Sequence, residues 1–127
     1  MLSQHEIEIR VRYQETDGQG HVHHANYFNY FELGRTEMLR AADRGYEQLE
    51  ASGLLLVVAE ISCRFLRPSQ FGDLLRLQTT TTKARGASLE HQYQLFRGEQ
   101  LLAEGRSKVA CVDRAGNVRR LPDWMLK

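Results

Sequence analysis

The sequence of 127 residues lacks the features that mark membrane, secreted and nucleic-acid-binding proteins. It has no apolar run close to the roughly 20 residues of a membrane-spanning helix, and its first ten residues alternate charged and apolar side chains without a signal-sequence core. Seventeen basic and sixteen acidic residues are dispersed, so no block of one sign offers a surface for nucleic acid or an acidic membrane. We therefore expect a cytoplasmic protein without a membrane span or a nucleic-acid partner.

Cysteine is scarce, and linker-like segments are absent. Cys63 and Cys111 each lie in an apolar or alternating stretch without CxxC spacing, which argues against a redox pair or a zinc site and predicts buried, reduced thiols. No repeat, low-complexity segment or Pro/Gly/Ser-rich linker interrupts the chain. Residues 1–127 are therefore predicted to form one domain, which is long enough to bury its own core.

Hydrophobic periodicity predicts one long helix within a set of strands. Residues 6–13 alternate, with Ile7, Ile9, Val11 and Tyr13 on one face, as in a half-buried strand. Residues 27–42 change to helical spacing and present a broad apolar face. The polar stretch 43–53 has room for one short helical turn. Further strands are predicted at 54–67, 74–83, 88–96 and 101–113, separated by turns at "FGD", "ARGA" and "RGEQ".

These elements predict an α+β fold in which a curved antiparallel sheet wraps one long helix. Short loops join antiparallel neighbours, so the second half is predicted to be a meander, with the first strand elsewhere on the same sheet. Gly34 is a poor helix former in mid-helix, and its expected use is a close approach of the helix to the sheet. We expect at least a dimer, with the strand at 89–96 available for edge pairing.

The stretch "ETDGQGHVHHANY" concentrates the chemistry of the chain immediately before the helix. Gly18 and Gly20 allow a tight turn and close approach to a ligand. The helix, beginning between His23 and Asn26, ends this loop with unpaired N–H groups, which suit an oxyanion. Asp17 then suits attack on a carbonyl, either as base or as nucleophile. The alternative is that Asp17 simply caps the loop or the helix.

Three histidines and a tyrosine in this region leave further alternatives open. One interpretation is a metal site formed by His21, His23 and His24, but no distant Cys or acidic cluster completes such a site. The alternative is a histidine that forms a hydrogen bond or orients the substrate. Tyr13 is either a core aromatic residue or a hydroxyl donor. A GxSxG elbow and the phosphate loops of P-loop and dinucleotide-binding proteins are absent.

Tyr13 followed by "ETDGQGHVHHANYFNYFELGRTEML" resembles the signature of the hot-dog-fold acyl-CoA thioesterases of the 4-hydroxybenzoyl-CoA thioesterase type. "RFLRPSQFGDLLRLQTTTTKARGASLEHQ" and "VACVDRAGNVRRLP" extend the resemblance over almost the whole chain. In detail the sequence is most similar to the bacterial branch associated with the Tol-Pal cell-envelope system. One departure is Glu15, which stands where many relatives have Asp and is interpreted as a structural position.

The resemblance implies hydrolysis of acyl-CoA without metal or other cofactor, by homodimers or homotetramers with active sites at the subunit interface. It implies that Asp17 is the catalytic carboxylate, that the amide near His24 polarises the thioester carbonyl, and that Tyr13 and His24 are catalytic partners. Substrate contacts are expected from the loop and the helix start, at Gly20, Val22, His23 and Asn26. Cell-envelope or lipid-synthesis proteins are candidate partners.

Other interpretations stay open at this point. Arg64, Arg67, Lys83 and Arg85 are candidates for contacts with coenzyme A phosphates, and solvated charges at strand ends are the alternative. A hot-dog hydratase would need a catalytic His set, against which the Asp-before-helix arrangement argues. A non-catalytic acyl-thioester-binding or scaffold subunit is the alternative from a different functional class.

Overall fold

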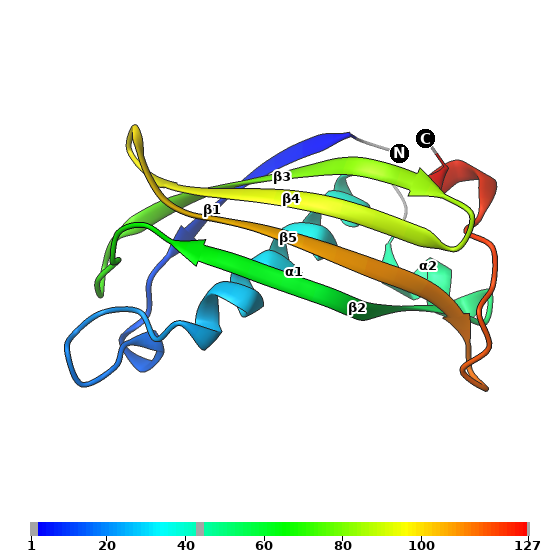
Figure 1. Cartoon of the computed structure of the whole chain (residues 1–127), viewed down its shortest axis with the longest axis horizontal. Helices are drawn as coiled ribbons and strands as arrows, with labels where there is room; N and C mark the ends of the chain where they lie inside the picture. The colour runs from blue at the N-terminus through cyan, green and yellow to red at the C-terminus, as the bar shows by residue number, and fades with distance from the viewer. Residues whose placement is uncertain (1–2, 43–44, 127) are drawn as a thin grey trace.

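The computed structural model describes residues 3–42 and 45–126, in which a five-stranded antiparallel sheet curves over one long helix (Figure 1). The strands are β1 (Gln4–Arg10), β2 (Leu54–Phe65), β3 (Leu74–Arg85), β4 (Ser88–Arg97) and β5 (Gln100–Asp113). The helices are α1 (Ala25–Ala41) and α2 (Tyr46–Ala51), with short 3-10 turns η1 (Tyr13–Glu15) and η2 (Asp123–Met125). The predicted α+β class is confirmed. None of the helices in the described ranges is long and apolar enough to cross a membrane.

The sheet order β1-β3-β4-β5-β2 agrees with the predicted turns but not with the predicted meander. Hairpins join β3 to β4 and β4 to β5, and Gly86 and Gly98 take the positive φ angles, 63° and 59°, that these turns require. However, β2 pairs with β5 at the far edge and not with β3, which follows it in sequence. The strand expected at an edge, 89–96, is part of β4 and lies between β3 and β5, so that expectation is wrong; the edges are β1 and β2.

Helix α1 packs closely on the sheet at two glycines. A Cβ on Gly34 would lie 2.8 Å from Cδ2 of Leu77 and would also clash with the hydroxyl of Thr79. A Cβ on Gly105 of β5 would meet the ring of Phe31 and lie 2.8 Å from the carbonyl of Ser62. The predicted close approach at Gly34 is therefore confirmed, and any larger side chain there would displace the buried side chains of Leu77 and Thr79.

The first strand ends earlier than the alternation predicts. Ile9 and Val11 are buried as expected, but β1 ends at Arg10 and the chain turns into η1 at Tyr13. The Tyr13 side chain is 76% exposed, so it does not continue the core face. Of the two thiols, Cys111 is buried and Cys63 half-buried, and both are free.

A charged residue that the helical pattern does not single out is buried under the sheet. Arg35 of α1 is 8% exposed and donates a 2.8 Å hydrogen bond to Tyr93 Oη, which lies 2.5 Å from Ser107 Oγ. Beside this chain of bonds, His91 is 5% exposed. Burial, and to a lesser extent the Arg35 charge, lower the pKa of His91 to about 4.

The buried histidine should make stability depend on pH. The ordinary pKa of histidine is 6.5, so between about pH 6.5 and pH 4 the unfolded chain binds more protons than the folded one, and stability falls as pH falls. The contribution is about 2 to 3 kcal/mol at the acidic end of this window. Urea unfolding near neutral pH and near pH 4.5 should therefore show a larger acid loss for the wild type than for His91→Gln. Equal acid losses in the two proteins would contradict this assignment.

Candidate active site

The segment between η1 and α1 is a loop held by short antiparallel bridges. Thr16 pairs with Val22, and His21 pairs with Gln70 of the segment that follows β2. The amide of Asp17 donates to the carbonyl of His21 at 2.7 Å. Gly20 adopts a φ of 81°, which favours glycine and lets the chain reverse. The loop is therefore built as a tight hairpin at the end of the sheet where β2 finishes.

Glu15 connects this loop to helix α1. Its carboxylate accepts hydrogen bonds from the amide of Arg12 at 2.8 Å and from the hydroxyl of Tyr30 at 2.9 Å, and it pairs with the Arg12 guanidinium at 3.2 Å. Its carbonyl accepts bonds from the amide of His23 and the side chain of Asn26. Glu15 is only 8% exposed. The residue interpreted as structural is therefore the anchor of the loop, and Asn26 shares in that anchoring.

Asp17 differs from Glu15 because its side chain reaches solvent. Asp17 Oδ1 accepts hydrogen bonds from the amides of Gln19 at 2.8 Å and His21 at 3.2 Å. The bond from Gln19, followed by that from His21, lowers the pKa of Asp17 despite some desolvation. Its other oxygen, Oδ2, has no partner among the described residues. Asp17 thus presents a negatively charged carboxylate with one oxygen available.

The start of α1 supplies a free amide. His24 is the N-cap residue, and its side chain does not cap the helix. The Asn26 and Tyr27 amides donate to the carbonyls of His23 and His24, and Nδ1 of His23 accepts from the Ala25 amide at 3.2 Å. Within the described part of the chain, the amide of His24 has no acceptor. The first turn therefore leaves this donor for a ligand, as the sequence predicts.

An open pocket of about 310 Å³ brings Asp17 and His24 together. Its aromatic wall is formed by Tyr27 and Phe65, whose ring centroids lie 5.1 Å apart, and the Tyr27 hydroxyl bonds to Ser69 Oγ at 2.9 Å. The imidazole of His24 stacks on that of His23, with centroids 4.3 Å apart. The complete lining is Asp17, His21, Val22, His24, Tyr27, Phe65, Leu66, Arg67 and Pro68.

Of the residues expected to bind substrate, and of the expected catalytic residues, only some lie at this pocket. Val22 lines it, and His23 supports the helix start beside it. Gly20 shapes the loop, whereas Tyr13 lies outside the lining and packs edge-to-face on Phe71 with centroids 5.6 Å apart. Sequence reasoning missed the wall residues Phe65 and Leu66, although two apolar side chains exposed just before Arg67-Pro68 are an unusual end for a strand.

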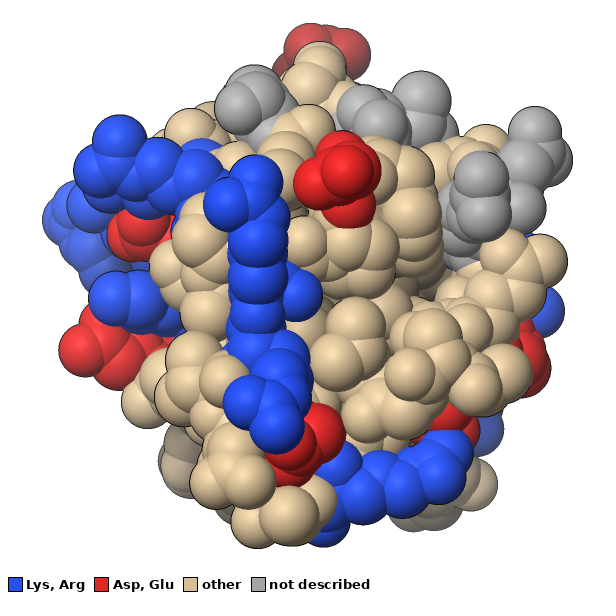
Figure 2. Space-filling view, turned by 90° about the vertical axis from the view of Figure 1, so that its right-hand side faces the viewer, with Lys and Arg blue, Asp and Glu red and all other residues tan. Residues whose placement is uncertain are grey.

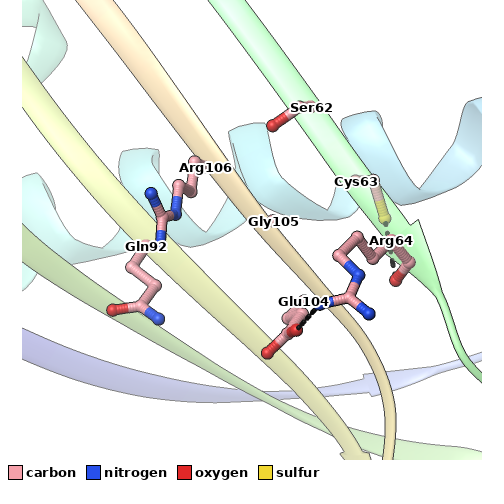
Figure 3. Close-up of a pocket in the computed structure, with 7 residues that line it drawn as sticks. All are labelled: Ser62, Cys63, Arg64, Gln92, Glu104, Gly105 and Arg106. Atoms are coloured by element: carbon pink, nitrogen blue, oxygen red, sulfur yellow. Dashed lines mark hydrogen bonds and ion pairs between the residues drawn. The ribbon is translucent and has the colours of Figure 1, made fainter.

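Arg64 lies on the opposite face of the sheet. It forms a 3.3 Å ion pair with Glu104 in a shallow groove of about 190 Å³, where Gln92 and Arg106 also line the surface (Figure 3). The groove holds neither a free carboxylate nor a helix terminus. It therefore offers less for acyl chemistry than the pocket at Asp17.

The remaining basic candidates lie at the other end of the molecule. Arg85 ends β3, whereas β3 begins at Leu74, at the end of the molecule that carries the Asp17 loop (Figure 1). Seen from that side, basic side chains form a band across the surface (Figure 2). Lys83 pairs with Glu90 at 3.5 Å. Within one chain, Lys83 and Arg85 are thus separated from Asp17 by the length of the sheet.

The histidines of the loop do not gather into a metal site. Residues 3–42 and 45–126 contain no cluster of three His, Cys, Asp or Glu side chains able to hold a metal ion. His23 instead accepts a hydrogen bond at the helix start, and His24 lies against Phe65 with ring centroids 6.3 Å apart. The geometry therefore favours organic acid-base or oxyanion chemistry over metal binding at this loop.

Comparison with known proteins identifies the family of the chain. The model of the thioesterase-like superfamily matches residues 11–127. The acyl-CoA thioester hydrolase YbgC of Escherichia coli is 37% identical over 106 residues, covering 83% of this chain and 79% of the relative. The acyl-CoA thioesterase YbgC of Haemophilus influenzae is 35% identical and covers 83% and 78%.

Solved structures give the same result. The structure of a "probable thioesterase" from Bartonella henselae superposes with a TM-score of 0.89 at 34% identity, covering 94% of this chain and 99% of that one. An Aquifex aeolicus protein superposes with a TM-score of 0.92 at 28% identity, covering 97% and 99%. The predicted hot-dog fold is confirmed. The chain belongs to the thioesterase-like superfamily.

Proposed function

We propose that the protein hydrolyses acyl-CoA thioesters to a free acid and coenzyme A, with Asp17 and the start of α1 as the reacting site. The observation that carries the proposal is that one pocket is lined by Asp17, with its exposed and negatively charged carboxylate, and by His24, whose backbone amide has no acceptor among the described residues. A carbonyl carbon placed between them meets a nucleophile or base on one side and an oxyanion donor on the other. The names of the E. coli and H. influenzae relatives support the thioester substrate.

The helix start stabilises the developing negative charge. As the carbonyl carbon becomes tetrahedral, its oxygen accepts a hydrogen bond from the His24 amide, and the positive end of the α1 dipole adds to the attraction. A donor of this kind is worth about 10² to 10³ in rate. The His24 imidazole lines the same pocket and can orient the thioester or a water molecule.

Asp17 has two routes to the acyl carbon. In one, the available carboxylate oxygen attacks, forms a mixed anhydride and expels the coenzyme A thiolate, after which water hydrolyses the anhydride. In the other, the carboxylate takes a proton from water, the resulting hydroxide attacks the acyl carbon, and the tetrahedral intermediate collapses with release of the coenzyme A thiolate. The lowered pKa of Asp17 keeps the carboxylate ionised near neutral pH, which is the form that both routes require.

The other predicted site residues take supporting places in this proposal. Gly20 and Val22 shape the loop and the pocket wall, while His23 and Asn26 secure the helix start. A catalytic role of the Tyr13 hydroxyl stays a prediction, and no step of the proposed reaction uses it. A cytoplasmic location, membership of the Tol-Pal branch and partners among cell-envelope or lipid-synthesis proteins likewise stay predictions.

Asp17→Asn should abolish hydrolysis because it removes the charge while preserving volume. Free thiol released from a panel of short, long and aromatic acyl-CoAs measures the loss, and circular dichroism confirms that the fold survives. The exposure of Asp17 makes the change tolerable for folding. Turnover at the wild-type rate would refute the role of Asp17. In a single turnover in ¹⁸O water, label in the Asp17 carboxylate would identify direct attack.

His24→Ala tests whether the imidazole contributes beyond the backbone. The amide and the helix dipole remain in this variant, so a purely backbone role predicts little loss. We expect kcat to fall about 10²-fold, the scale of a positioned acid-base or hydrogen-bonding group. His24→Gln, which keeps a hydrogen-bonding side chain, is the matched control and should recover part of the rate. Unchanged turnover and pH profile in His24→Ala would leave only the amide as the functional group.

We further propose that the chain forms a homodimer through the free edge of β2, with a homotetramer as the larger assembly. β2 is an edge strand that exposes Val57 and Val58, at 43% and 49%. Antiparallel pairing of two such edges would hide backbone groups that attract other strands. Antiparallel pairing would also place the start of β2 in one chain, at Leu54, beside the end of β2 in the partner, at Phe65. The basic end of one chain, which includes Arg85, would then lie beside the Asp17 pocket of the other.

Val58→Asp should therefore convert the dimer to monomer and lower activity with it. Light scattering after size-exclusion chromatography measures the mass, and thiol release from an acyl-CoA measures the activity. Gln4→Asp places the same side chain on β1, the other sheet edge, and should leave the mass unchanged. A wild-type protein that is monomeric and still hydrolyses thioesters would contradict the proposal.

A further inference from the structure

Two aromatic rings stand exposed at the end of the molecule that carries the Asp17 loop. Tyr13 is 76% exposed and Phe71 62%, although they come from segments far apart in sequence. Their ring centroids lie 5.6 Å apart at an interplanar angle of 78°, an edge-to-face contact. They are the two most exposed aromatic rings among the large apolar side chains of the described ranges. Such a pair in solvent is a candidate contact surface.

The aromatic pair adjoins the proposed active site. The Tyr13 carbonyl accepts bonds from the Thr16 amide at 3.1 Å and from the Thr16 hydroxyl at 2.7 Å, one residue before Asp17. Phe71 follows Gln70, which pairs with His21 of the loop. The same segment contributes Arg67 and Pro68 to the pocket wall. Residues 67–71 therefore connect the pocket wall to the exposed rings of Tyr13 and Phe71.

Two arginines, one beside the rings and one at the pocket, form no ion pair with a carboxylate in the described part of the chain. Arg10 donates a 2.8 Å hydrogen bond to the carbonyl of Gly72, the neighbour of Phe71, and Arg67 lines the pocket. Neither forms an ion pair with any residue of 3–42 or 45–126. By contrast, Arg12 pairs with Glu15 and Arg97 with Asp73. Arg10 and Arg67 are thus available for an anion.

We propose that Tyr13, Phe71, Arg10 and Arg67 bind the nucleotide end of coenzyme A, a site that rests on the function proposed above. The purine stacks on an exposed ring, as bases stack on aromatic side chains in proteins that bind single-stranded nucleic acid. The arginines take the phosphates through charge-assisted hydrogen bonds. The flexible pantetheine arm spans the rim between the phosphates and the thioester at Asp17.

This assignment gives Tyr13 a role that depends on its ring and not on its hydroxyl. The hydroxyl has no hydrogen-bond partner in the described part of the chain, and Tyr13 does not line the Asp17 pocket. An acidic carrier protein would also be attracted by the arginines, but its acyl-pantetheine arm brings no purine to the rings. The nucleotide therefore accounts for both the rings and the charges.

The test compares one acyl group on coenzyme A with the same group on pantetheine, which lacks the nucleotide. Phe71→Ala should raise KM for acyl-CoA about tenfold, with kcat nearly unchanged, because the purine is bound equally in ground and transition states. Phe71→Ala should not alter the kinetics on acyl-pantetheine. Tyr13→Ala should raise KM for acyl-CoA by a similar factor. Tyr13→Phe is the matched control and should behave as wild type, because it keeps the ring.

Three outcomes would overturn the proposal. Equal losses on the two substrates would show that the rings support the loop, and loss of kcat in Tyr13→Phe would restore a hydroxyl role. If the ring variants lost activity only on a substrate carried by acyl carrier protein, the rings would bind a protein partner and not the nucleotide. Binding of coenzyme A itself, measured by calorimetry, keeps the test independent of hydrolysis: weaker binding in Phe71→Ala supports the site even if thioesters are not hydrolysed, and equal binding refutes it.

Discussion

The arrangement of the site depends on one buried carboxylate, that of Glu15. It lies between the 3-10 turn and α1, where it accepts hydrogen bonds from Tyr30 and from the Arg12 amide. Hydrogen bonds to a charged group contribute about 1.5 to 3 kcal/mol each, and removing the carboxylate would leave the buried Tyr30 hydroxyl without its acceptor. Burial and the neighbouring Glu15 raise the pKa of Tyr30, which keeps that hydroxyl protonated and donating. The buried Glu15 carboxylate therefore ties the loop that carries Asp17 to helix α1.

This anchoring separates the structural carboxylate of Glu15 from the carboxylate of Asp17, the proposed reactive group. Because Glu15 bears the contacts that fix the loop, Asp17, two residues later, remains exposed and bonds only to backbone amides of its own loop. In the same loop the His23 amide donates a hydrogen bond to the Glu15 carbonyl, whereas the next amide, that of His24, has no acceptor among the described residues. A charged oxygen and an unpaired N–H group in one pocket thus follow from how the loop is closed.

Sequence periodicity was sufficient for local structure and failed where distant segments meet. The helical spacing of Tyr27, Tyr30 and Phe31 located α1, and mid-helix Gly34 correctly indicated the close contact with β3. The position of β2 beyond β5 was missed, because glycine turns identify adjacent strands but carry no information on where a strand goes after a helical crossover. Burial of Arg35 was missed because its acceptor, Tyr93, lies 58 residues away.

The same distinction applies to the site. Asp17 and the helix start are neighbours in sequence, so their pairing could be predicted from spacing and from the resemblance. Phe65 and the surface at Phe71 reach the loop only because residues 65–73 return beside it, with the Val22 amide bonded to the Ser69 carbonyl at 2.8 Å. Tyr13 illustrates the limit of the alternating pattern, because its register assigned it to the core while η1 turned it outward.

An open pocket is a poor place for thioester hydrolysis unless something covers it. Electrostatic stabilisation of an oxyanion weakens in water, and Asp17 and His24 are both exposed in the single chain. The apolar side chains around them, Phe65 and Leu66, are 48% and 44% exposed and stand at the end of the free β2 edge. A partner chain paired at that edge and the bound substrate would together exclude water from the site. The exposure of Asp17 and His24 in one chain therefore fits the proposed dimer, in which the neighbouring chain would cover the pocket.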